Sequence, residues 1–107
     1  MKILFDQGTP VPLRRELANH AVDTVYERGW SNLENGKLLD AAEQEGYELL
    51  VTTDQNLRFQ QNLSKRAIAV LVLTSTSWPR IAKQTDAIRA TIDRTGPGGY
   101  REVLIPA

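Results

Sequence analysis

The sequence of 107 residues predicts an α/β protein, a three-layer α/β/α sandwich with a mostly parallel sheet of about five strands. Three observations predict this class. Short apolar runs alternate with helical patterns along the whole chain. The connections between them are short, which favours a sheet wound on both sides. The run Ala67–Leu73 is continuously apolar, as is typical of a central parallel strand that is covered on both faces.

Five apolar runs are the candidate strands. They are rich in Val, Ile or Leu and are bounded by polar or turn-forming residues. The runs are Lys2–Phe5, Ala21–Val25, Glu48–Thr52, Ala67–Leu73 and Glu102–Ile105. The third and fourth runs are the most apolar, so we expect them near the centre of the sheet.

Helical patterns occupy the segments between these runs. The clearest is Glu34–Glu45, which has an apolar stripe and ends at Gly46, a residue that commonly terminates helices. A proline opens a short helix at Pro12–Leu17. Isoleucines near helical spacing predict a longer helix at Pro79–Arg94, and a further helix is predicted at Asn56–Leu63.

Length and composition favour one domain that spans residues 1–107. The 13 basic residues balance the 13 acidic ones, so any nucleic-acid site must be local. The absence of cysteine excludes disulfides, zinc–thiolate sites and a thiol nucleophile, and it predicts a cytoplasmic protein. No apolar run approaches the ~20 residues of a membrane-spanning helix, so we expect no membrane association.

Two aspartates follow predicted strands. Asp6 comes directly after the first strand, and Asp54 comes just after the third. Ligands of open α/β sheets bind beyond the carboxyl ends of the strands. If the two strands are neighbours, ~5 Å apart, the carboxylates can share one divalent cation. Each aspartate alone is also explained as a helix cap, but the pair favours a functional site.

Three segments carry a resemblance to a known family: Met1–Asp6, Gly36–Ala42 and Leu49–Asp54. In order and spacing they resemble the PIN-like domain family, and more closely the short PIN-like proteins related to VapC-type toxins. The resemblance extends over roughly residues 1–74. Its most specific part is Val51–Asp54.

The resemblance implies a metal-dependent endoribonuclease. In that family, acidic side chains hold Mg²⁺ or Mn²⁺, and the cation activates a water that cuts single-stranded RNA. Asp6 and Asp54 are thereby implied as catalytic metal ligands. The family places further acids where this chain has Asn35, with Glu34 just before it, and Asn56. Asn35 or Glu34, together with Asn56, is therefore expected to assist the two aspartates in binding the cation. An amide oxygen can bind a cation but adds no charge, so these asparagines should weaken metal binding.

Basic residues near the predicted edge are candidate RNA contacts. Arg58 and Phe59 would suit a phosphate and a stacked base. Alternatively, Leu57 and Phe59 anchor a surface helix to the core. Arg14 and Arg15 could contact phosphate, although an adjacent basic pair is more typical of a solvent-exposed helix face.

Three functions follow from these patterns. The leading hypothesis is a metal-dependent nuclease, of which the toxin component of a toxin–antitoxin pair is one form. For it the resemblance implies an antitoxin protein and a second copy in a homodimer as partners. The second is a catalytically weak or inactive module that binds RNA or a protein, which Asn35 and Asn56 favour. The third is a receiver-like or flavodoxin-like domain, which ranks last because Gln7 follows Asp6 where a receiver has a second acid.

Overall fold

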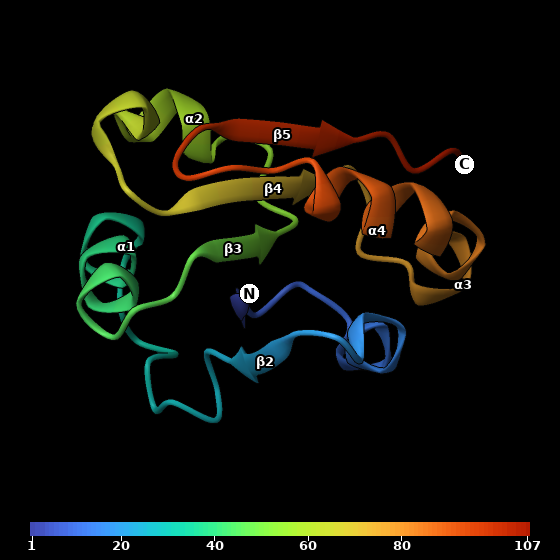
Figure 1. Cartoon of the computed structure of the whole chain (residues 1–107), viewed down its shortest axis with the longest axis horizontal. Helices are drawn as coiled ribbons and strands as arrows, with labels where there is room; N and C mark the ends of the chain where they lie inside the picture. Colours follow the sequence, from blue (N-terminus) through green and yellow to red (C-terminus); the bar gives the residue numbers. More distant parts are fainter.

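The computed structural model describes residues 1–107 and contains one five-stranded sheet in the order β2-β1-β3-β4-β5 (Figure 1). All neighbouring strands are parallel. The strands are β1 Lys2–Phe5, β2 Ala21–Thr24, β3 Leu49–Thr52, β4 Ala69–Leu73 and β5 Tyr100–Val103. The predicted α/β class and parallel sheet are confirmed, and β3 and β4 are buried at every position.

Helices cover both faces of the sheet. Four are α-helices and three are 3-10 helices. The α-helices are α1 Asn35–Gln44, α2 Leu57–Gln60, α3 Trp78–Ile81 and α4 Thr85–Asp93. The 3-10 helices are η1 Val11–Leu17, η2 Leu63–Lys65 and η3 Ala82–Gln84. None of the helices is long and apolar enough to cross a membrane.

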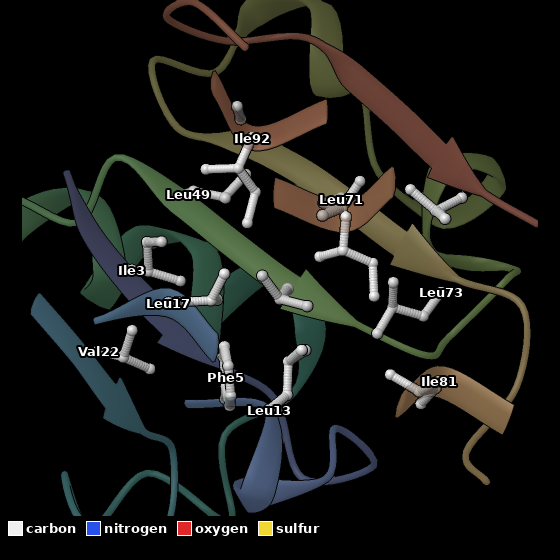
Figure 2. Packing of buried hydrophobic residues seen from close by; sticks show 14 of the residues in the cluster. Ile3, Phe5, Leu13, Leu17, Val22, Leu49, Leu71, Leu73, Ile81 and Ile92 are labelled. Atoms are coloured by element: carbon white, nitrogen blue, oxygen red, sulfur yellow. The ribbon is translucent and has the colours of Figure 1, made fainter. Parts of the chain in front are cut away.

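The first face of the sheet packs against η1, α3 and α4. Leu13 of η1 lies beside Phe5 of β1, and Ile92 of α4 lies beside Leu49 of β3 (Figure 2). These side chains are essentially fully buried. Burial of this kind stabilises by about 1.5–3 kcal/mol per large apolar side chain, so η1 is held by packing although it is short.

The second face packs against α1, α2 and η2. Leu38 and Leu39 of α1 and Leu57 of α2 lie in one buried cluster with Leu50 and Val70 of the strands. Helices on both faces make three layers. In Figure 1, α1 lies at the left of the view, and α3 and α4 lie at the right.

Some predicted boundaries were wrong. The helix expected at Pro12–Leu17 is a 3-10 helix, in which Leu13 N donates to Pro10 O at 3.1 Å, three residues back. The helix expected at Pro79–Arg94 is divided into α3, η3 and α4, since the backbone leaves the helical region at Gln84.

Two other segments are shifted. The helix expected at Asn56–Leu63 is only the single turn of α2, followed by η2. The last strand begins at Tyr100 rather than Glu102, because pairing starts directly after the glycine turn, where Val70 N donates to Gly99 O at 3.0 Å. The strand ends before Ile105, whose N–H donates to the Thr74 hydroxyl at 2.7 Å.

Candidate functional site at the carboxyl edge

The candidate site lies where the strand order reverses. The chain leaves β1 for β2 on one side and later places β3 on the other side of β1. In doubly wound sheets of this order, ligands bind beyond the carboxyl ends of the first and third strands, at this switch point. Phe5, the last residue of β1, pairs with Val51, so β3 extends one residue further and ends at Thr52. Asp6 and Asp54 therefore follow neighbouring strands at the expected edge.

The buried hydroxyl of Thr52 connects the two aspartates. Thr52 is the last residue of β3 and only 1% exposed. Its Oγ1 donates to Asp6 Oδ2 at 2.8 Å and accepts from Asp54 N at 3.1 Å. Asp6 N also donates to Val51 O at 2.9 Å, which continues the ladder beyond β1. Asp6 and the backbone of Asp54 thus belong to one hydrogen-bonded network.

Local backbone bonds hold each carboxylate. Asp6 Oδ1 accepts from Gln7 N at 2.9 Å, and Asp54 Oδ1 accepts from Asn56 N at 2.9 Å. The second bond is an Asx turn, which shapes the loop that enters α2. Neither aspartate occupies the helix N-cap position, which belongs to Pro10 for η1 and to Asn56 for α2. Each carboxylate can accept about four bonds, so both retain acceptor capacity for a cation.

Asn35, the first residue of α1, also reaches the site. Its Nδ2 donates to Asp54 Oδ2 at 3.3 Å and to Gln60 Oε1 at 2.8 Å. The amide N–H of Asn35, not its oxygen, therefore faces Asp54. Glu34 is exposed and forms no hydrogen bond with the aspartates; it lines a shallow cavity of about 360 Å³ with Asn35 and Gln60.

The side chains of Asn56 and Arg58 form no hydrogen bond with the aspartates. Asn56 is exposed and bonds to Asp54 only through its backbone N–H. The Arg58 guanidinium lies 4.7 Å from the centre of the Phe59 ring and 5.2 Å from that of Tyr100. Arg58 is exposed and forms no hydrogen bond with Asp54, and its contact with a phosphate stays a prediction.

The two arginines of η1 have different surroundings. Arg14 forms a bidentate ion pair with Glu27, at 2.8 and 3.2 Å. The hydrogen bond from Arg14 and the N–H of Thr24 lower the pKa of Glu27, so this carboxylate stays ionised opposite the guanidinium. Arg15 is exposed and has no ion-pair partner, which leaves it available for a phosphate.

The carboxylates at this edge offer oxygen donors, the ligand type that hard divalent cations prefer. No group of three or more acidic or histidine side chains comes together in the chain, so the site has two carboxylates. Mg²⁺ is commonly bound by one or two carboxylates, with waters and substrate phosphates in the remaining positions. Asp6 and Asp54 match that pattern, whereas a cage built of protein ligands alone is not formed.

Two residues of this edge were missed by the sequence analysis. Thr52 looks like any strand-forming threonine, and only the pairing of β1 with β3 brings its hydroxyl to Asp6. Tyr26 follows β2 by two residues, is 81% exposed and lines a cavity together with Asp6. Tyr26 could have been found from the sequence, because it is an aromatic residue in a polar segment directly after a predicted strand.

Comparison with family models, with curated proteins and with solved structures gives no match to this chain. The PIN-like resemblance therefore stays a prediction. The α/β fold rests on the strand pairing, and the candidate site rests on the contacts of Asp6, Thr52 and Asp54.

Proposed function

We propose that the chain is a divalent-cation-dependent nuclease in which Asp6 and Asp54 bind Mg²⁺ or Mn²⁺. One observation carries the proposal: both aspartates follow adjacent strands at the switch point of the sheet, and Thr52 connects them. Ligand sites of open α/β sheets occur at this position. Support also comes from the oxygen-only donors, which suit hard cations.

The residues of the site have distinct proposed roles. The carboxylates of Asp6 and Asp54 bind the cation. Thr52 and Asn35 are positioning residues, because each donates to one carboxylate oxygen and fixes its direction. A bound Mg²⁺ or Mn²⁺ supplies a water with a lowered pKa and neutralises charge on a phosphodiester.

The proposed substrate is single-stranded RNA, which the PIN-like resemblance implies. The chain has no net charge, so phosphate recognition must come from the cation and from local basic residues. Arg15 and Arg58 are the proposed candidates, since both are exposed and neither forms an ion pair. An antitoxin protein and a second copy of the chain stay predicted partners.

Cleavage of RNA tests the activity. Wild type, Asp6→Asn and Asp54→Asn are incubated with a labelled single-stranded RNA and Mn²⁺ or Mg²⁺, and products are resolved on a gel. We expect cleavage by wild type that needs the cation and is lost in both variants. Asp93→Asn, an exposed aspartate at the end of α4, is the matched control and should cleave like wild type. Cleavage that survives in both site variants would reject the site.

The second candidate function is an RNA- or protein-binding module without catalysis. Asn35 favours this second function. Its side-chain N–H donates to Asp54 Oδ2, whereas a carboxylate at this position would be a third acidic ligand and would bind the cation more tightly. RNA binding by wild type without cleavage at any Mn²⁺ concentration would select this function. The strand order is also that of receiver and flavodoxin folds, but a shared fold does not imply a shared function.

A further inference from the structure

A groove extends from Asp6 toward the loop after β2. It encloses about 370 Å³ and is lined by Asp6, Val11, Arg14 and Tyr26, among others. Tyr26 is 81% exposed and Val11 is 54% exposed. Two exposed apolar side chains thus border a cavity that has a candidate metal ligand at its end.

The side chain of Tyr26 is exposed and stacks on no aromatic ring or cation of the protein. Trp30 and Tyr47 pack edge to face with each other, and Arg28 lies over Trp30. Phe59, the other highly exposed aromatic, has the Arg58 guanidinium over its ring. No cation or aromatic ring contacts Tyr26 in this way. Single exposed aromatics are common, but this one combines the lack of a stacking partner with a place beside Asp6.

The wall of the groove favours a neutral ligand group over a phosphate. Arg14 is paired with Glu27 through two hydrogen bonds, so the positive charge is compensated. Glu27 is itself fixed by the N–H of Thr24 at 2.9 Å. A planar, uncharged group that stacks on an aromatic ring fits this lining, and nucleobases stack on tyrosine in this manner.

We propose that Tyr26 stacks on an unpaired base of single-stranded RNA in this groove. The base lies next to the phosphate that the cation bound by Asp6 would contact. The inference rests on the proposed function and narrows its substrate to strands whose bases are unstacked and accessible. Gln7 lies in the same groove, is exposed and makes no side-chain hydrogen bond to the protein. Its carboxamide is available to the edge of the stacked base.

Binding measured apart from cleavage tests the groove. A fluorescein-labelled oligouridylate, whose bases are largely unstacked, is titrated with protein in Ca²⁺, and a gel checks that the strand stays intact. Stacking on one aromatic contributes enough that Tyr26→Ala should weaken binding by roughly 5- to 150-fold. Tyr26→Phe keeps the ring and should bind like wild type. Leu104→Ala, which removes another exposed apolar side chain away from the groove, should also bind like wild type.

A second strand in which abasic spacers replace the bases separates base from phosphate recognition. We expect wild type and Tyr26→Ala to bind this strand equally. Equal binding of oligouridylate by both proteins, or no binding by wild type, would contradict the proposed base-binding groove. If binding depends on Tyr26 but Mn²⁺ yields no cleavage, the proposed nuclease activity is rejected and the proposed base-binding groove is supported. If cleavage is found but binding does not depend on Tyr26, the proposed nuclease activity is supported and the proposed base-binding groove is rejected.

Discussion

Thr52 is a buried residue whose hydroxyl serves two partners, the side chain of Asp6 and the backbone of Asp54. A buried hydroxyl with one donor and one acceptor bond has a fixed direction. Fixed hydrogen bonds to a metal-binding carboxylate typically matter 10- to 100-fold for metal affinity. Thr52 is therefore the residue through which the fold controls the geometry of the proposed site.

Replacing Thr52 by valine separates this role from ordinary stability. Thr52→Val should lower the free energy of unfolding by about 1–2 kcal/mol, because it removes two hydrogen bonds at a buried position. It should also weaken Mn²⁺ binding by about 10- to 100-fold. Thr95→Val is the matched control, since Thr95 is buried and donates to Thr91 O at 2.6 Å, remote from the aspartates. An equal loss of Mn²⁺ affinity in both variants would contradict the positioning role.

Asn35 offers a gain-of-function test. Asn35→Asp places a third carboxylate beside Asp54 Oδ2, where the amide N–H now donates. Without metal, repulsion between the carboxylates should lower the melting temperature. With Mn²⁺, the added charge should tighten binding, so the melting temperature should rise more steeply with concentration than in wild type. Identical Mn²⁺ dependence in both proteins would show that this position does not face the cation.

Sequence patterns located Asp6 and Asp54 because both follow apolar runs, and strand ends are where α/β sites form. They did not locate Thr52 or the orientation of Asn35. Those depend on which strand pairs with β1 and on which atoms of an amide face a neighbour, and both are set by tertiary packing. The side chain of Arg58 was likewise unpredictable, since it turns to Tyr100, distant in sequence.

At the scale of elements, the helices after β3 and β4 lie on opposite faces of the sheet. The steps β3 to β4 and β4 to β5 go in the same direction, yet α2 packs with α1 while α4 packs with η1. The two connections therefore have opposite hands, whereas nearly all parallel crossovers are right-handed. Helical periodicity shows which side of α4 is apolar, but it does not show which face of the sheet this side covers.

The turn before β5 gives a test at this scale. Gly98 and Gly99 both have positive φ, at 69° and 88°. A Cβ on Gly98 would lie 2.8 Å from Arg66 O, whereas a Cβ on Gly99 would meet nothing within 4 Å. Gly99→Ala should cost about 1 kcal/mol for the left-handed backbone, and Gly98→Ala should cost clearly more. Urea unfolding measures both, and equal losses would contradict this geometry of the turn.

For the whole molecule, one buried tyrosine makes the free energy of unfolding fall at high pH. Tyr47 is 3% exposed, and its hydroxyl donates to Asp23 Oδ2 at 2.6 Å. Burial, and then the hydrogen bond to Asp23, raise its pKa to about 12 from the ordinary 10.0. In the unfolded chain this phenol ionises near pH 10, and in the folded protein it ionises only near pH 12. The stabilisation is therefore fully present below pH 10 and is lost as the pH rises to 12.

We expect the free energy of unfolding to fall by about 2–3 kcal/mol between pH 10 and pH 12 because of Tyr47. Tyr47→Phe removes the titrating group and should flatten this part of the curve. Denaturant unfolding at several pH values measures the effect. The same decline in wild type and in Tyr47→Phe would assign it to other groups.

The class of the molecule was predictable, because alternating apolar runs and helical patterns allow few arrangements. Its strand order was not, since local patterns do not record which runs become neighbours. That order is what places β1 beside β3 and brings Asp6 and Asp54 to one edge. The proposed function therefore depends on a tertiary feature, and it is best tested at the cation itself.

Calorimetric titration of the metal-free protein with Mn²⁺ tests this cation site directly. Wild type should bind one Mn²⁺ or a closely spaced pair, and Asp93→Asn should behave like wild type. Asp6→Asn and Asp54→Asn should each lose the binding heat while remaining folded. Unchanged Mn²⁺ binding in these two variants, or none in wild type, would contradict a metal site at the ends of β1 and β3.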